Sequence, residues 1–216
     1  MQILAIFDFC ETLVDLQSAP PFLDKIAQIN PHYQSRFNAI RRRFFDRIYR
    51  RVKLKYFDYK KAKFEALRGV KECDAEKIAK DYANYLVNRL NQKVIDKLNY
   101  HKSQNHTLAI VSGGLEIYIK YVADFLEIPR ENVIAISLHA QNGILTGEIE
   151  GIHTMEYRKL YKLANVMDLR AFDLQRSFVY SDCPSDIALF SLVGNRVAIE
   201  CGKDIRWAKI LKYEIL

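Results

Sequence analysis

Side chains that can do chemistry gather at four places in this 216-residue sequence. Three of these places follow a short apolar run, and the remaining one, Lys159, is the third along the chain and lies four residues before Leu163. The other three are Asp8-Phe9-Cys10-Glu11-Thr12-Leu13, Ser112-Gly113-Gly114 and Ser181-Asp182-Cys183-Pro184-Ser185-Asp186.

These residue types suit a magnesium ion and a phosphate group. Mg²⁺ prefers hard oxygen ligands and usually keeps several waters, so one or two carboxylates and a substrate phosphate suffice to bind it. The Ser112 hydroxyl, backbone N–H groups at a helix start and the Lys159 ammonium would neutralise the other phosphate oxygens. With that charge compensated, a carboxylate can attack phosphorus and form an aspartyl phosphate.

The elements that must position these residues alternate between strands and helices. Apolar residues spaced three or four apart predict helices between the strands, and this alternation implies a parallel sheet whose strands end at one ligand-binding edge. Asn142-Gly143 predicts a hairpin between Val133–Leu138 and the run from Leu145 to Ile149. The predicted strands are Ile3–Phe7, Thr107–Val111, Ser177–Tyr180 and Val197–Ile199, and the helical stripes are Leu115, Ile119, Val122 and Leu126, and Leu160, Leu163 and Met167.

The region from about Leu16 to Asn105 lacks this alternation. It is rich in helix formers, places Phe37, Ile40, Phe44 and Ile48 at helical spacing, and has almost no strand signal. Pro20-Pro21, Asn30-Pro31 and Gly69 divide it into about four predicted helices. We therefore expect an α-helical subdomain inserted into an α/β core.

The four groups, in this order, resemble the motifs of the haloacid dehalogenase (HAD) superfamily of Mg²⁺-dependent phosphatases, in its phosphoserine-phosphatase-like branch (subfamily IB). Asp8 to Thr12 looks like the first motif, Ser112 the second, Lys159 the third, and Asp182 with Asp186 the fourth. The resemblance implies a three-layer, Rossmann-like core with a mostly parallel sheet, formed by residues 1–15 and 106–216. It also implies that residues 16–105 form a helical cap.

The resemblance further implies a role for each matching residue. Asp8 would be the nucleophile and a metal ligand, Asp182 would bind Mg²⁺, and Asp186 would support the metal and its waters. Ser112, Gly113 and Lys159 would bind the transferring phosphoryl group, and Thr12 would orient the first loop. The expected activity is hydrolysis of a small phosphomonoester, with Mg²⁺ as the cofactor and a small phosphorylated metabolite as the partner.

Cys10 departs from the family pattern, which normally has a second aspartate at this position. The family uses only the backbone carbonyl here for the metal, so Cys10 can still contribute a metal ligand. The missing carboxylate protonates the leaving group and activates water, work worth about 10²–10⁴-fold in rate. A slow phosphatase is the hypothesis; the alternatives are a phosphotransferase and a non-catalytic protein that binds a phosphorylated ligand.

The net charge of +7 is concentrated in one block. Residues 36–63 contain twelve Lys or Arg against two Asp, a local net of +10, which leaves the remainder of the chain at −3. A solvated outer face of the cap is the default interpretation of this block. The alternative is that Arg43 and Arg47 face the cleft and bind a second anionic group of the substrate. Contact with nucleic acid or an anionic membrane surface ranks last, and no nucleic-acid partner is expected.

Composition restricts the class of protein further. Half of the residues are hydrophobic, but no stretch approaches the roughly 18 uninterrupted apolar residues of a membrane span, and no signal peptide is apparent. The four cysteines are scattered without a C-x-x-C pair, which fits reduced thiols. We expect a cytoplasmic protein.

Overall fold

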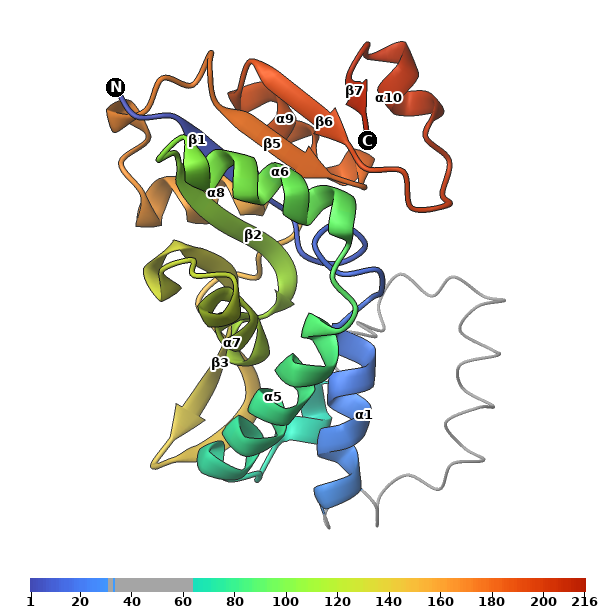
Figure 1. Ribbon diagram of the computed structural model, residues 1–216. Coiled ribbons are helices and arrows are strands. Elements are labelled where there is room, and N and C mark those ends of the chain that lie inside the picture. The colour runs from blue at the N-terminus through green and yellow to red at the C-terminus, as the bar shows by residue number, and fades with distance from the viewer. Residues whose placement is uncertain (31–32, 34–63) are drawn as a thin grey trace, which may run out of the picture.

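The computed structural model describes residues 1–30, 33 and 64–216 and is built around one seven-stranded sheet (Figure 1). The strand order is β4-β3-β2-β1-β5-β6-β7, and every neighbouring pair is parallel except β3 with β4. This confirms the predicted mostly parallel sheet. The strands are β1 (Leu4–Phe7), β2 (Thr107–Leu115), β3 (Val133–Gln141), β4 (Ile144–Glu150), β5 (Phe178–Ser181), β6 (Asn195–Ala198) and β7 (Glu214–Ile215).

The register of the central strands brings their carboxyl ends to the same level. Phe7, the last residue of β1, pairs with Ile110 of β2 and with Tyr180 of β5. Asp8 therefore leaves the sheet beside the ends of both neighbours. β2 continues further than predicted, through Leu115, with a register shift against β3 between Val111 and Leu115.

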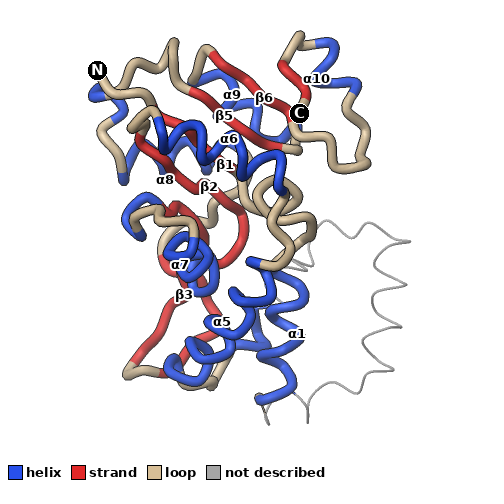
Figure 2. Tube along the Cα trace, in the orientation of Figure 1, coloured by secondary structure: helices blue, strands red, loops and turns tan. Residues whose placement is uncertain are grey.

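Helices cover both faces of the sheet, which gives the three layers expected (Figure 2). Side chains alternate along β1, so that Ala5 and Phe7 belong to one hydrophobic cluster while Leu4 and Ile6 belong to the other. The first cluster includes residues of α6 (Gln92–Ser103) and α7 (Glu116–Phe125), and the second includes residues of α8 (Tyr157–Val166) and α9 (Ile187–Leu192). Trp207 of α10 (Arg206–Ile210) packs against the second cluster.

The described part of the insertion between β1 and β2 is helical. It contains α1 (Ala19–Ile29), the 3₁₀ turn η1 (Glu65–Leu67), α5 (Glu72–Val87) and α6. α5 packs against α7 and lies beside α1, whereas α6 packs against β2 (Figure 1). The predicted helix through Phe37 to Ile48 lies outside the described residues, and the division at residue 105 stays a prediction. Three further 3₁₀ turns are η2 (Arg130–Asn132), η3 (Leu169–Ala171) and η4 (Pro184–Asp186).

The predicted hairpin is formed by β3 and β4. Its turn is Asn142-Gly143, with φ angles of 53° and 72°, a conformation that these two residue types adopt readily. The Glu72 N–H donates to the Gly143 carbonyl over 2.9 Å, and the Leu145 N–H donates to the Val70 carbonyl over 2.8 Å. The hairpin tip thus holds the segment that leads into α5.

Within the described ranges, no helix combines the length and the apolar character needed to cross a bilayer.

Candidate active site

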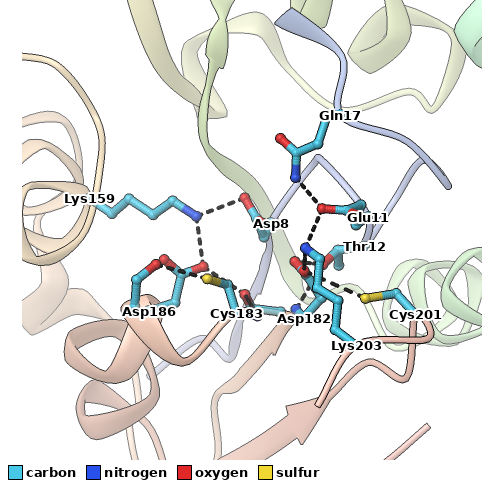
Figure 3. Close-up of polar contacts among 12 residues, drawn as sticks. Asp8, Glu11, Thr12, Gln17, Lys159, Asp182, Cys183, Asp186, Cys201 and Lys203 are labelled. Carbon is cyan, nitrogen blue, oxygen red and sulfur yellow. Dashed lines mark hydrogen bonds and ion pairs between the residues drawn. The ribbon is translucent and has the colours of Figure 1, made fainter. Parts of the chain in front are cut away.

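Polar residues gather at the carboxyl edge of the sheet, where β1, β2 and β5 end, and Figure 3 shows those that follow β1 and β5. Asp8 follows β1, Asp182 follows β5, and Asp186 ends η4 just beyond it. Ser112 lies in the last part of β2, and Lys159 lies in the first turn of α8. Four segments that are far apart in sequence therefore contribute residues to this edge.

Lys159 joins two of the carboxylates. Its Nζ lies 2.8 Å from Asp8 Oδ1 and 2.7 Å from Asp186 Oδ2, and all three side chains are buried. The Ser181 hydroxyl donates a second hydrogen bond, of 2.6 Å, to Asp186 Oδ2. The ammonium of Lys159 thus lies between two of the carboxylates at this edge, and its role toward a phosphoryl group stays a prediction.

Burial changes the acidity of this pair. Removal from water raises the pKa of Asp8 to about 7, an effect reinforced by the carboxylates of Asp186 and Asp182 and opposed by the Lys159 ammonium. Burial by itself lowers the pKa of Lys159, but the charges of Asp8 and Asp186 outweigh it and raise the pKa well above its usual value. Lys159 therefore stays charged, and an added cation would favour the ionised form of Asp8.

Thr12 and Asp182 bind each other in both directions. The Thr12 hydroxyl donates to Asp182 Oδ1 over 3.3 Å, and the Asp182 backbone N–H donates to Thr12 Oγ1 over 3.1 Å. Both residues are buried. The first loop is thus fixed to the loop after β5, and the orienting role of Thr12 in the reaction stays a prediction.

The Ser112 loop is shaped by close contacts at its glycines. The Gly114 N–H donates to Ser112 Oγ over 2.9 Å. A Cβ atom on Gly113 would lie 3.1 Å from Met155 Cγ and 3.2 Å from the Thr154 carbonyl oxygen, so glycine allows the segment before α8 to approach. This contact sets α8, and with it Lys159, against the end of β2.

Cys10 directs its thiol into a buried network at the start of α1. The Cys10 Sγ and Ser18 Oγ atoms lie 3.0 Å apart, and Ser18 Oγ lies 2.8 Å from the Tyr118 hydroxyl oxygen. The Tyr82 hydroxyl donates to the Ser18 carbonyl, and the Leu115 N–H donates to the Tyr118 hydroxyl. Burial, together with the charge of Asp8, raises the pKa of the Cys10 thiol to about 11, so at neutral pH the thiol is protonated.

The donor set fits a divalent cation in part. Asp186 Oδ1 is buried and has no hydrogen-bond partner among the described residues, so this oxygen is suited to a cation or its water. Asp182 differs, because Thr12 and Lys203 engage its two oxygens. In the described part of the chain, no three His, Cys, Asp or Glu residues come together as a ready metal-binding group. Two lysines hold the three carboxylates instead.

Sequence reasoning missed Lys203 and its contacts with Glu11 and with the predicted metal ligand Asp182. Lys203 lies in the loop after β6, 2.8 Å (Nζ to Oδ2) from Asp182, and it also contacts Glu11, which accepts a hydrogen bond from Gln17 (Figure 3). The position of Lys203 could have been found from the predicted sheet, because β6 was predicted and its carboxyl end lies beside that of β5. Arg43 and Arg47, predicted as candidates for a second anion site, lie outside the described residues.

Comparison with known proteins identifies a family model and a curated relative that match this chain. A family model described as haloacid dehalogenase-like hydrolase matches residues 5–191. A phosphoserine phosphatase of Methanocaldococcus jannaschii is 26% identical over 136 residues, which cover 63% of this chain and 62% of that enzyme, less than two thirds of its length.

Solved structures share the fold at lower identity. A protein of unknown function from Bordetella pertussis Tohama I has a TM-score of 0.80 at 19% identity, over 100% of this chain and 98% of its own. A phosphoserine phosphohydrolase-like protein from Francisella tularensis has a TM-score of 0.62 at 22% identity, over 100% and 95%. A phosphoserine phosphatase solved as an analogue of its phospho-aspartyl intermediate has a TM-score of 0.60 at 20% identity, over 99% and 92%.

Proposed function

The chain belongs to the haloacid dehalogenase-like hydrolase family, and we propose that it is a Mg²⁺-dependent phosphatase that hydrolyses a small phosphomonoester through an aspartyl phosphate on Asp8. The observation that carries the proposal is the buried contact of 2.8 Å between Asp8 Oδ1 and the Lys159 ammonium at the carboxyl edge of the sheet. The carboxylate that would attack phosphorus therefore lies beside a cation that can bind the phosphoryl oxygens.

Each residue at the edge has a defined task in this reaction. Asp8 attacks phosphorus in line with the leaving oxygen, and Lys159 stabilises the negative charge of the transferring group. Ser112 and the backbone at Gly113 bind its remaining oxygens. Thr12 keeps the Asp8 loop in place through its two hydrogen bonds with Asp182.

The residues that would hold Mg²⁺ are Asp8, Asp182, Asp186 and the backbone carbonyl of Cys10. When bound, the ion supplies charge compensation for the phosphate and for the carboxylates. The partnerless Oδ1 atom of Asp186 supports this assignment among the described residues.

Relatives support the choice of a phosphatase among the hydrolases. The archaeal protein with 26% identity is named a phosphoserine phosphatase, and one structure of the same fold represents a phospho-aspartyl intermediate. We propose a small phosphorylated metabolite as the substrate class, with phosphoserine as one member of the panel to be tested. A cytoplasmic location and the absence of a nucleic-acid partner stay predictions.

The geometry of Cys10 favours phosphotransfer as a second candidate function. Its thiol lies 3.0 Å (Sγ to Oγ) from the buried Ser18, and it offers no carboxylate that could activate a water molecule. Slow water activation lengthens the lifetime of an aspartyl phosphate, and an acceptor hydroxyl then has more time to react. Adding alcohols to the assay and measuring the phosphorylated products separates this function from hydrolysis.

The test of the main proposal compares wild type with Asp8→Asn. The protein is incubated with Mg²⁺ and acetyl phosphate or p-nitrophenyl phosphate, and released phosphate and hydroxylamine-sensitive protein-bound phosphate are measured. Wild type should give both signals and Asp8→Asn neither, while Asp81→Asn, at an exposed position of α5, should behave as wild type. Turnover that survives Asp8→Asn would contradict the mechanism. Phosphate binding without either signal would favour the non-catalytic alternative.

A further inference from the structure

Lys203 lies outside all four motifs, yet it contacts one of the carboxylates assigned to the metal. It belongs to the loop between β6 and α10, at the edge of the sheet where the site lies. Its Nζ atom is 2.8 Å from Asp182 Oδ2, and its side chain remains 48% exposed. The ammonium therefore reaches a buried carboxylate from the solvent side.

With Lys203 in place, the Asp182 carboxylate has a partner at each oxygen. Oδ1 accepts from the Thr12 hydroxyl and Oδ2 accepts from Lys203, and the carboxylate is only 3% exposed. A carboxylate buried to this extent needs a compensating charge. Lys203 supplies that charge in the described structure, and a divalent cation at the same carboxylate would supply it instead.

Lys203 also contacts Glu11, so it connects the loop after β1 with the loop after β5. Glu11 has a φ of 57° and accepts a hydrogen bond from Gln17. The lysine thus has a second carboxylate available, and loss of its contact with Asp182 need not leave the ammonium without a partner (Figure 3).

We infer that Lys203 is a positioning residue that neutralises Asp182 in the metal-free protein and competes with the divalent cation for its carboxylate. This inference rests on the proposed function, because it concerns the metal site of that reaction. A positive charge near a bound cation weakens binding by repulsion as well as by competition for the ligand. Removal of the Lys203 charge should therefore strengthen Mg²⁺ binding.

Isothermal titration calorimetry of the full chain with MgCl₂ tests the competition directly. Lys203→Gln should bind Mg²⁺ about three- to tenfold more tightly than wild type, the range expected for one partly exposed charged hydrogen bond. Lys209→Gln removes the same charge from an exposed position on α10 and should leave the affinity unchanged. Lys203→Arg keeps the charge and should stay within about twofold of wild type. An unchanged or weaker affinity in Lys203→Gln overturns the inference.

Thermal unfolding in EDTA tests the pairing without any metal. Lys203→Gln should lower Tm relative to wild type and to Lys209→Gln. In the Asp182→Asn background the same substitution should lower Tm by less, because only the contact with Glu11 is then lost. The same loss in both backgrounds, or no loss in either, would show that Lys203 does not act through Asp182 and would overturn the inference. If Lys203→Gln leaves the Mg²⁺ affinity unchanged, the result contradicts the role of Lys203 but not the proposed cofactor. If neither wild type nor Lys203→Gln binds Mg²⁺, the result contradicts both the competition and the proposed cofactor.

Discussion

The ammonium of Lys159 and the carboxylate of Asp8 form an ion pair of 2.8 Å in which the two side chains are only 6% and 8% exposed. The partners are far apart in the sequence, and the same ammonium also binds Asp186. Removal of one member of such a set leaves the others as buried, uncompensated charges. This ion pair therefore contributes to stability as well as to the proposed catalysis.

Lys159→Met should lower both activity and stability. The substitution keeps the volume of the side chain but leaves Asp8 and Asp186 facing each other, which costs about 3–5 kcal/mol of unfolding free energy. Loss of the cation for the phosphoryl group should reduce kcat/KM by about 10²-fold or more. Urea unfolding and steady-state hydrolysis of p-nitrophenyl phosphate measure the two effects.

Arg158→Met is the matched control, because its charge is adjacent in sequence but its guanidinium stacks on the exposed ring of Tyr157. It should change both quantities little. Equal losses in the two variants would contradict the specific role of Lys159.

Much of the fold was predictable because the central strands each contain an apolar run that can be found in the sequence. The run before Asp8 is apolar throughout, as a strand buried on both faces must be, and the other three predicted strands are formed as well. The rule that parallel strands end at one edge then predicted, without any distance information, that Asp8 and Asp186 lie close together. Short elements such as α10 and β7 went unpredicted, because they are too short to show periodicity.

The rest of the site depends on contacts that no local pattern records. Lys203 reads as an ordinary loop lysine until β6 is placed beside β5. The direction of the Cys10 thiol depends on Ser18, whose position is set by Tyr82 and Tyr118 from two other helices. Sequence spacing predicts which residues share an edge, but it does not predict which atoms meet.

Cys10→Asp should accelerate dephosphorylation of the phospho-enzyme. A carboxylate at this position can protonate the leaving group and activate water, so we expect about a 10- to 100-fold increase, within the range of general acid–base catalysis. Rapid-quench measurement of a single turnover gives the dephosphorylation rate separately from phosphorylation.

Cys10→Ser is the control for that experiment, since it retains a hydrogen-bonding group toward Ser18 without adding a carboxylate. It should dephosphorylate at about the wild-type rate. If Cys10→Asp is no faster than Cys10→Ser, then Cys10 does not limit turnover.

Tyr118→Phe should destabilise the protein by about 1–3 kcal/mol, because the Leu115 N–H and the Ser18 hydroxyl lose a buried partner. Since Leu115 ends the strand that carries Ser112, the KM for a phosphomonoester should also rise. Tyr85→Phe, on an exposed ring of α5, should leave both values unchanged. Urea unfolding with steady-state kinetics measures the two effects, and a neutral Tyr118→Phe would show that this hydroxyl contributes nothing to either.

His101 should make the protein less stable in mild acid. The ring is fully buried, with Nδ1 2.8 Å from His106 Nδ1 and Nε2 2.9 Å from the Tyr180 hydroxyl oxygen. Burial, with smaller contributions from His106 and Lys97, lowers its pKa to about 4. The unfolded chain takes up a proton near pH 6.5 but the folded chain does not, so stability is full above pH 6.5 and falls as the pH drops toward 4.

The change between pH 7 and pH 5 should be about 2 kcal/mol, obtained from urea unfolding at several pH values. His101→Gln removes the titrating ring and should flatten the pH dependence in this range, although its stability at pH 7 will be lower because the hydrogen bonds change. His139→Gln, at an exposed position on β3, should keep the wild-type slope. Because the pH slope is compared rather than the stability itself, a general loss of packing in His101→Gln cannot produce the expected result, and an unchanged slope would assign the acid sensitivity to other groups.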